Sequence, residues 1–256
     1  MSTSGKYLYG FADATYAPAP ELLGLASAPV HSIRVDEIAA IVSDHPVEKL
    51  SLLRRNVEPH HRVVRDVSSH STFIPATFGH ISDDEEQMRA VLRDNYTEIR
   101  AELERLAGKV EMGLKLMWDV DNIFDFFVGT DRELRNRRDR VFGKSRPTLE
   151  DKLELGAFFD KRLKLERERL GSQIIDALRP VTSEVRVNSV SDEKMVLNAA
   201  FLIERTREKE FEEALYRAAG LFDSNYAVDY NGPWPPYNFV RLTLKLTTAE
   251  AAVGGG

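Results

Sequence analysis

The chain has 256 residues, of which 43% are hydrophobic and 30% are charged, a balance typical of folded globular proteins. Its net charge of −6 argues against non-specific binding to nucleic acid or anionic lipid, because such binding needs concentrated lysine and arginine. The absence of cysteine excludes disulfides, cysteine-ligated zinc, iron–sulfur clusters and a thiol nucleophile.

The chain opens with a predicted strand. Residues 6–12 alternate in a way that places Tyr7, Tyr9 and Phe11 on one face. Such a face resembles the base-stacking sheet of RNA-recognition domains, but a basic, aromatic-rich second motif is missing and the net charge has the wrong sign. We therefore expect these rings to face the core or another domain.

The next elements alternate between strand and helix. Residues 31–36 and 38–43 are expected to form a hairpin. Apolar residues then recur at helical spacing over residues 50–67, and we expect Pro59 in the first turn of a second helical piece. Residues 72–79 are predicted to return as a strand.

The next residues predict the start of a helix. Ser82 and Glu85 have the spacing of a capping box, and the apolar stripe of the helix continues to Leu106, with Gly108 as the expected C-cap. The acidic run 83–86 lacks the alternation and the glycine of a calcium loop, so we interpret it as helix capping.

A second set of strands begins at residues 111–118, which alternate again. A long helix is predicted from Thr148 to Arg179, where Pro180 closes it. The remaining predicted elements are a short apolar helix over 123–128, a hairpin over 184–204, a helix ending near Gly220, and strands over 226–230 and 240–246.

This order predicts an α+β protein with two ferredoxin-like α/β-sandwich domains. We expect an N-terminal domain over residues 1–108 and a C-terminal domain over 109–250, the second with a helical, hairpin-like insertion at 120–180. An up-down helical domain is the alternative for that insertion. Residues 251–256 should form a frayed tail.

The sequence lacks the common catalytic motifs. None of the six histidines has the i, i+4 spacing of a helical metal site, and the usual nucleotide and hydrolase signatures do not occur. His60 lies on the apolar stripe of its helix, so we expect a hydrogen-bonded, partly buried side chain. We expect no enzyme activity, no metal and no cofactor.

One segment, residues 131–146, has a local excess of positive charge. Arg135, Arg137 and Arg138 in this segment could contact phosphates or an acidic partner. The interleaved acidic residues favour a solvated connector instead.

The least generic stretch is Asn231–Val240, with the sequence NGPWPPYNFV. Glycine and proline leave its backbone little freedom, which predicts a stiff, extended crossing. It should hold Trp234 and Tyr237 at a fixed separation, as a packing wedge or a docking surface. Because strands are predicted on both sides, we favour a structural crossover with partly exposed aromatics over a free polyproline ligand.

Four stretches carry a family resemblance: Tyr7–Gly10, Ile74–Gly79, Glu111–Lys115 and Gly232–Val240. Together they resemble the GvpF/GvpL family of gas vesicle proteins over almost the whole chain. The chain departs from the family pattern at Ala76-Thr77, where an arginine is common, and at Met112, where a tryptophan is common.

The lack of a signal-like N-terminal segment and of a membrane-length apolar run predicts a cytoplasmic protein. The resemblance implies a non-enzymatic accessory or minor structural protein of gas vesicle assembly, associated with the vesicle. Its expected partners are the small hydrophobic shell protein and other accessory proteins, without nucleic acid or membrane insertion. Unassembled shell subunits expose apolar surface that aggregates unless a partner covers it. We expect Trp234, Pro235, Pro236 and Tyr237 to supply that covering surface.

Two other function classes stay open. An RNA-binding module would use Tyr7 and Tyr9 and would bind single strands in a salt-sensitive way. An enzyme with an unrecognised site would have a concave pocket with a strongly shifted titratable group.

Overall fold

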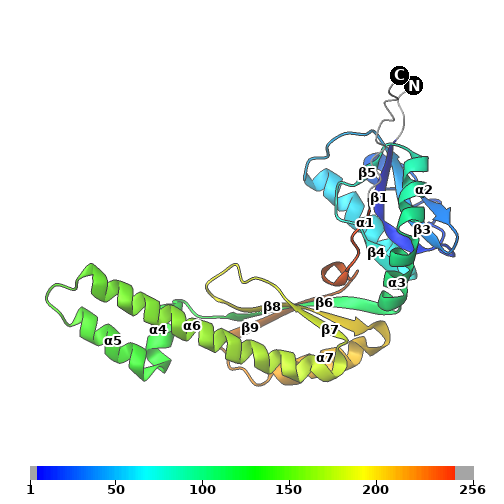
Figure 1. Ribbon diagram of the computed structural model, residues 1–256. Helices are drawn as coiled ribbons and strands as arrows, with labels where there is room; N and C mark the ends of the chain where they lie inside the picture. The colour runs from blue at the N-terminus through cyan, green and yellow to red at the C-terminus, as the bar shows by residue number, and fades with distance from the viewer. Residues whose placement is uncertain (1–4, 246–256) are drawn as a thin grey trace. The chain divides into compact units, whose positions relative to one another are not determined.

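The computed structural model describes residues 5–245, which form an α+β protein with two antiparallel sheets (Figure 1). Contacts divide the chain into two compact units. The first unit combines the residues up to Glu111 with the segment that begins at Pro233, and the second is Met112–Gly232. The division after Glu111 lies close to the expected domain boundary at residue 108. The segment from Pro233 was expected in the C-terminal domain but belongs to the same unit as the N-terminal residues.

The sheet of the first unit has the strand order β2-β3-β1-β4, and β5 also pairs with β1. The predicted hairpin is confirmed, and its turn contains Asp36 at a φ of 49°, which aspartate tolerates better than most residues. The strands are β1 (Gly5–Asp13), β2 (Val30–Val35), β3 (Ile38–His45), β4 (Phe73–Pro75) and β5 (Ile81–Ser82).

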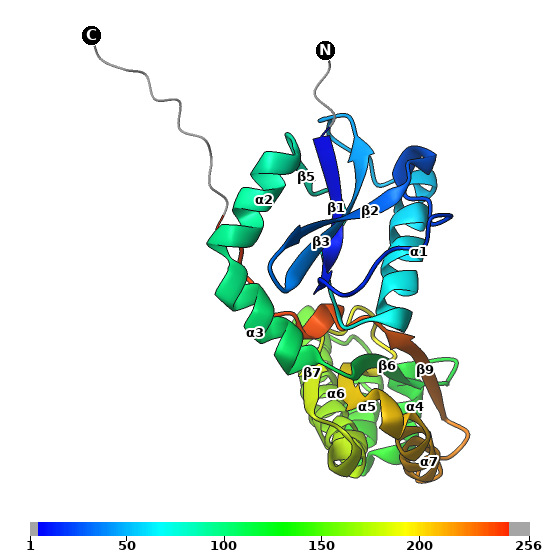
Figure 2. The same cartoon turned by 90° about the vertical axis from the view of Figure 1, so that its right-hand side faces the viewer.

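Helices cover both faces of this sheet: α1 lies on one side, and α2 and α3 lie on the other (Figure 2). Residues 38–42 of the central strand β3 are therefore fully buried on both faces. The helices are α1 (Arg54–His70), α2 (Glu85–Asp94) and α3 (Tyr96–Leu106), with 3-10 turns η1 (Leu25–Ser27) and η4 (Tyr237–Phe239).

Helix α1 contains Pro59 in its interior, so the prediction that a second helical piece starts there is wrong. A proline at this position removes one hydrogen bond, to the carbonyl of Arg55. Arg55 is exposed, so water can solvate that carbonyl.

Strand β1 contains a β-bulge. Its register against β3 shifts between Leu8 and Gly10, which makes Tyr9 an extra residue and inverts the alternation beyond it. Tyr7 and Tyr9 lie in the core beneath α1, whereas Phe11 is buried outside that cluster. The predicted shared face is therefore confirmed for the two tyrosines and wrong for Phe11.

The helix predicted from Ser82 begins two residues later. The Asp84 side chain accepts from the N–H of Gln87 at 2.8 Å, and Gln87 Oε1 accepts from the N–H of Asp83 at 2.6 Å. Asp84 is therefore the N-cap, and Gln87 bonds back to the residue before it instead of completing a capping box, so the predicted cap at Ser82 is wrong. The helix is also not continuous, because it breaks at Asn95 into α2 and α3.

Two predicted strands are shorter or absent. Only Phe73–Pro75 of the predicted strand over 72–79 pairs, at the edge expected from its proline. The described part of the predicted strand over 240–246 pairs with no strand, because helix side chains take its hydrogen bonds. Glu102 accepts from the N–H of Arg241 at 2.7 Å, and the buried Asn95 amide bonds both the N–H and the carbonyl of Lys245 (2.7 and 3.1 Å). Residue 246 and the predicted tail lie outside the described residues.

The second sheet has the order β7-β8-β6-β9. Its strands are β6 (Lys109–Trp118), β7 (Glu184–Val187), β8 (Met195–Glu204) and β9 (Tyr226–Trp234). The helices of the second unit are α4 (Ile123–Thr130), α5 (Arg132–Phe142), α6 (Leu149–Leu178) and α7 (Glu208–Ala219), with turns η2 (Arg179–Val181) and η3 (Arg205–Arg207).

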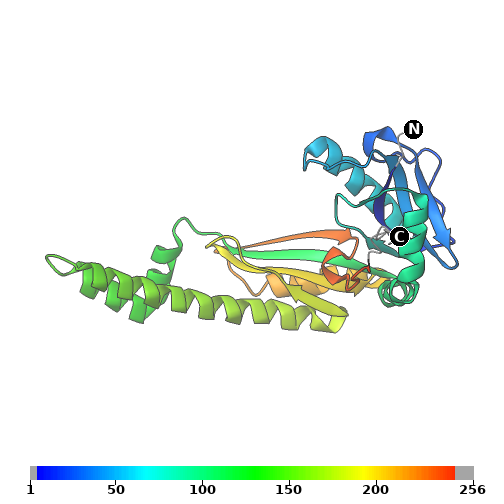
Figure 3. The ribbon, with the colours of Figure 1, turned by 45° about the horizontal axis from the view of Figure 1, so that its top comes forward.

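The predicted long helix is confirmed as α6, which starts at a capping box between Thr148 and Asp151. Its C-terminal half packs with α7 against the sheet, and its N-terminal half extends beyond the sheet beside α5 (Figure 3). The predicted helix-rich insertion therefore contains a helical hairpin. None of the helices within residues 5–245 combines the length and apolar character that a membrane crossing needs.

Candidate partner-binding site

His60 connects α1 to the strands beneath it. Its Nδ1 lies 2.8 Å from the Tyr7 hydroxyl, which also accepts from the N–H of Gly79 at 3.2 Å. Burial lowers the pKa of His60 to about 4, so the ring is neutral at pH 7 and Nδ1 can accept from Tyr7. The prediction of a hydrogen-bonded core histidine is confirmed, and the histidine holds the loop before β5 in place.

Tyr9 is equally enclosed. Its hydroxyl lies 2.8 Å from the Ser43 hydroxyl and accepts from the N–H of Leu25 at 2.8 Å. Both Tyr7 and Tyr9 have an exposed fraction of 0%, so neither ring can stack on a base. The RNA-binding alternative thereby loses the feature on which it depended.

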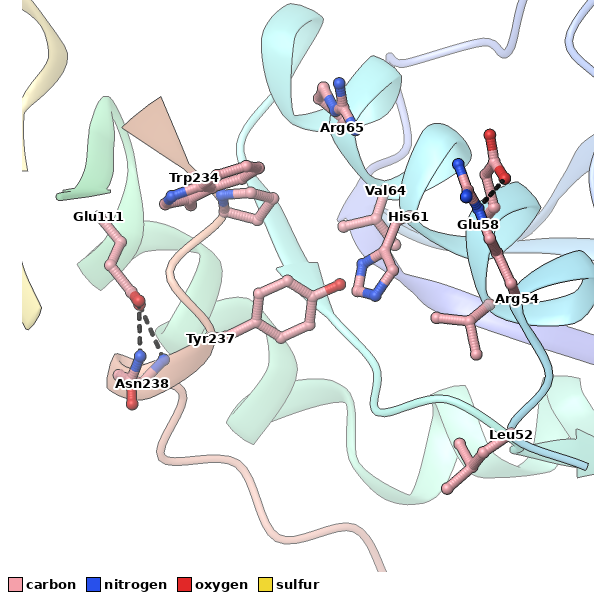
Figure 4. A pocket seen from close by; sticks show the side chains of 12 residues that line it. Leu52, Arg54, Glu58, His61, Val64, Arg65, Glu111, Trp234, Tyr237 and Asn238 are labelled. Carbon is pink, nitrogen blue, oxygen red and sulfur yellow. Dashed lines mark hydrogen bonds and ion pairs between the residues drawn. The ribbon is translucent and has the colours of Figure 1, made fainter. Parts of the chain in front are cut away.

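A groove of about 760 Å³ lies beside this core, within the first unit (Figure 4). One wall is the outer face of α1 with the residues just before it, and the opposite wall is the segment from Trp234 to Asn238. The lining residues are Leu52, Arg54, Val57, Glu58, His61, Val64, Arg65, Glu111, Trp234, Pro235, Tyr237 and Asn238.

Three of the four residues predicted to bind a partner line this groove. Trp234 has an exposed fraction of 40% and Tyr237 is half-buried, whereas Pro235 is buried beneath them. Pro236 is buried and does not line the groove. The motif is extended as predicted up to Trp234, where β9 ends, and it departs from the predicted extended crossing at Tyr237, where η4 begins.

Two buried carboxylates fix the motif in place, and the sequence reasoning did not identify them. Glu111 accepts from the backbone N–H of Asn238 at 2.8 Å and from its side-chain amide at 2.5 Å. Burial raises the pKa of Glu111, against the lowering effect of these bonds. The sequence signal that could have identified Glu111 was a single acidic residue in a strand whose apolar residues otherwise alternate.

The second carboxylate is Glu102. Burial alone would raise its pKa, but the Arg105 guanidinium at 2.7 Å and the N–H of Arg241 lower it on balance. Arg105 also donates to the carbonyl of Phe239 at 2.5 Å. The backbone on the C-terminal side of Tyr237 is therefore held by charge-assisted hydrogen bonds, which are stronger than neutral ones.

The Tyr237 hydroxyl is buried and has no hydrogen-bond partner among residues 5–245. It points across the groove toward His61, whose ring centroid lies 6.5 Å from that of Tyr237 (Figure 4). Burial, followed by the Glu111 charge, raises the pKa of Tyr237 to about 12. The hydroxyl is thus protonated at neutral pH.

The sequence of this chain matches a known protein family. The profile of the family described as gas vesicle synthesis protein GvpL/GvpF matches residues 5–241. The chain belongs to this family. The match includes both walls of the groove and both sheets, so the resemblance inferred from the four motifs is confirmed.

Named members of the GvpL/GvpF family are similar over nearly their full length. Gas vesicle protein F of Dolichospermum flosaquae is 30% identical over 240 residues, which cover 92% of this chain and 97% of that protein. Gas vesicle protein F of Streptomyces sp. (strain CB03234) is 30% identical over 247 residues, covering 94% and 100%. The crystal structure of GvpF from Anabaena sp. PCC7120 superposes with a TM-score of 0.83 at 28% identity, covering 94% and 99%.

The arginines predicted as a possible electrostatic contact lie in the second unit of this GvpL/GvpF member. Arg135 donates to the carbonyls at the end of α4, Arg137 pairs with Glu133 at 3.1 Å, and Arg138 pairs with Asp139 at 2.7 Å. Arg137 also lies over the Phe158 ring of α6, 4.1 Å from its centroid, and the segment forms helix α5 where a solvated connector was expected. Their contact with a partner stays a prediction.

The titratable groups of the groove were the remaining candidates for metal binding or catalysis. Within the described part of the chain, no group of three histidine, aspartate or glutamate residues is placed to hold a metal ion. The two groove groups with raised pKa are Glu111, whose oxygens both bond to Asn238, and Tyr237, which stays protonated at neutral pH. Neither is arranged as a nucleophile with an adjacent base.

Proposed function

We propose that this GvpL/GvpF family protein is a non-enzymatic accessory protein of gas vesicle assembly that binds the small hydrophobic shell protein. It limits shell-protein aggregation during nucleation and wall growth, acting in the cytoplasm and associating with the vesicle transiently or as a minor component. The observation that carries the proposal is the groove between α1 and the Trp234–Asn238 wall.

The groove has the properties that such a role requires. Its volume lies in the range of sites that enclose a small ligand, so it can cover one short segment of a partner. Apolar side chains from both walls, among them Val57, Val64 and Trp234, would remove apolar surface of that segment from water. Covering the segment before wall assembly prevents contact between unassembled shell subunits.

The strand orders support a finer description of the fold, in which both sheets are variants of the ferredoxin-like arrangement. In each sheet the first strand in chain order lies between the third and the fourth, and the second lies at the edge beside the third. The second sheet has a helix at each crossover, whereas in the first sheet a loop with η1 replaces the first helix. A high-resolution experimental structure would test this description.

A double substitution tests the proposed binding. We expect tagged Trp234→Ala, Tyr237→Ala chains to capture at least about 10-fold less co-expressed shell protein, because both aromatic side chains of the wall are lost. Circular dichroism must show that the variant stays folded. Tyr216→Ala removes an exposed aromatic on α7 that does not line the groove, and should leave capture unchanged. Undiminished capture by a folded double variant would contradict the proposal.

A further inference from the structure

We infer that the protein forms a symmetric dimer through the N-terminal half of α6. The contact is made by Leu149, Leu153 and Gly156, which together form the leucine face of this helix. Two copies pack with these faces together and their helices antiparallel, and the leucines of each copy enter a pocket beside the leucine face of the other. The dimer does not use the groove, so the inference goes beyond the proposed function.

The leucine face continues the side of α6 that packs on the second sheet. Alternate steps of four and three residues lead from Leu149 to Leu163 and Leu170, which is the spacing of one helical face. Both of these later leucines are buried where α6 contacts β8. A Cβ atom at the neighbouring Gly171 would lie 3.6 Å from Leu197 of that strand. The apolar side of the helix is therefore longer than the sheet that covers it.

Where α6 extends beyond the sheet, the described elements leave this side of the helix uncovered (Figure 3). Leu149 and Leu153 have exposed fractions of 73% and 64%, and open space surrounds the Cβ position of Gly156. Helix α5 contacts another side of α6, where Arg137 lies over the Phe158 ring. Large apolar side chains in water mark an interaction surface, and the glycine beside them allows a second helix to approach closely.

A pocket of about 330 Å³ lies where the leucine face meets the sheet, between α6 and the connection from β7 to β8. Phe159, Leu163 and Val190 supply its apolar lining. Antiparallel packing about a two-fold axis near Gly156 brings the two leucines of one copy to the pocket of the other, because they lie on opposite sides of the axis along the helix. One surface thus contains both the protruding side chains and the pocket that receives them, which is the self-complementarity of a two-fold interface.

The charges of this surface are complementary under the same symmetry. The pocket is lined by three acidic residues and one basic residue: Asp160, Asp192, Glu193 and Arg167. Lys164 pairs with Asp160 at 2.8 Å, and with this lysine counted the acids still exceed the bases by one. Lys152 flanks the leucine face four residues before Gly156, whereas the acidic residues at 150, 151 and 154 lie farther round the helix. The antiparallel arrangement brings this lysine toward the acidic pocket of the other copy, which favours a second copy as the occupant.

The test is the oligomeric state of the full-length chain, measured by sedimentation equilibrium. We expect a mass twice the 29.0 kDa of one chain. The double variant Leu149→Glu, Leu153→Glu should raise the dissociation constant of the dimer by about 10-fold or more, because apolar contacts are replaced by like charges. The control Leu221→Glu changes a leucine with a similar exposed fraction of 71% outside α6, and it should leave the dimer intact. Circular dichroism must show that both variants are folded.

Cross-linking tests the orientation separately, because the chain contains no cysteine of its own. Gly156→Cys places a thiol beside the two-fold axis in open space, and a short bismaleimide should join two copies there. Glu154→Cys is the matched control, since it lies two residues away on another side of α6 and should give little covalent dimer. Equal cross-linking at the two positions would contradict the antiparallel arrangement.

Two further outcomes would overturn the inference: a single-chain mass for the unsubstituted protein, or a dimer that the leucine substitutions leave intact. If the chain is a monomer and these substitutions reduce capture of the shell protein, the leucine face binds that protein and a second copy is the wrong occupant. The variant Trp234→Ala, Tyr237→Ala should remain dimeric, so failure of the proposed function would leave the dimer unaffected.

Discussion

His60 joins three segments that are distant in sequence. It lies on α1, its Nδ1 meets Tyr7 of β1, and its other ring nitrogen donates to the carbonyl of Ala76. Acceptance of the Tyr7 hydroxyl hydrogen by Nδ1 requires the neutral ring, and burial holds the pKa of His60 near 4 instead of 6.5, although the bond to Ala76 acts in the opposite direction. The residue therefore makes the N-terminal core sensitive to acid.

The pH dependence of stability follows from this shift. The unfolded chain binds a proton at His60 more readily than the folded chain, so its contribution is present above pH 6.5 and is lost as the pH falls toward 4. We expect the free energy of unfolding to fall by about 2 kcal/mol between pH 7 and pH 5 from this residue. Urea titrations at the two pH values would measure the fall, and His60→Gln should show a correspondingly smaller difference.

Gly24 illustrates a second constraint at the residue scale. A Cβ atom at this position would lie 1.8 Å from the Tyr9 hydroxyl, and that hydroxyl is fixed by Ser43 and Leu25. We expect Gly24→Ala to destabilise the protein by about 1–3 kcal/mol through overpacking. Gly156→Ala on α6 is the control, since open space surrounds its position, and it should stabilise by about 0.5–1 kcal/mol. Thermal unfolding of both variants would measure these changes. An unchanged melting temperature of Gly24→Ala would contradict the argument.

At the element scale, the segment after η4 is held by helix side chains in place of a strand ladder. Asn95, at the break between α2 and α3, supplies both a donor and an acceptor to the backbone of Lys245. Its amide thus makes the backbone hydrogen bonds that a neighbouring strand would otherwise make. The break between the two helices is the position from which this side chain reaches the segment.

Substitution of Asn95 should release the segment. We expect Asn95→Ala to cost about 1–3 kcal/mol, because two backbone groups lose their partners, and to speed amide exchange at Lys245. Hydrogen-exchange mass spectrometry of the peptide that ends at Lys245 would measure this. Asn136→Ala, at an exposed position on α5, should have neither effect.

Elements whose pattern is local were predictable from the sequence. The long helix α6 and both hairpins follow from apolar periodicity and turn residues that lie within each element. The bulge at Tyr9 was not predictable, because it depends on the close approach of β4 to Gly10, where a Cβ atom would lie 2.3 Å from the Ile74 carbonyl. The predicted strand over 240–246 failed for a similar reason, since its partners lie on helices about 140 residues earlier.

The candidate site was also only partly predictable from the sequence. The unusual composition of the Trp234–Tyr237 stretch identified one wall of the groove. Helix α1 supplies the other wall, and only the fold brings Arg65 and His61 opposite Tyr237. Charge and periodicity within α1 indicate an ordinary amphipathic helix and give no sign of this role.

At the scale of the whole molecule, the first unit is built from two chain segments that are separated by the entire second unit. The later segment satisfies Asn95, Glu102 and Glu111, all of which are buried. Without it, each of these three side chains would lose at least one hydrogen-bond partner, and Glu111 would lose both bonds to Asn238.

Excising the second unit would test this dependence. We expect residues 1–111 alone to unfold at a much lower temperature than the first unit of the intact chain, because each unsatisfied group costs about 1–3 kcal/mol. A chain in which a short glycine–serine linker joins residue 111 to residue 233 should recover most of the loss. The linker can be short, because the neighbouring strands β6 and β9 bring Gly113 next to Asn231. Melting curves of the two fragments would contradict the argument if they coincided.

During synthesis, the groove can form only after the residues of both walls have left the ribosome. One wall is complete once residue 65 has left the ribosome, but the other needs residue 238. A nascent or prematurely terminated chain that lacks the later wall therefore has no groove. Under the proposed function, such a chain cannot bind the shell protein at this site until residue 238 has been synthesised and the segment has folded.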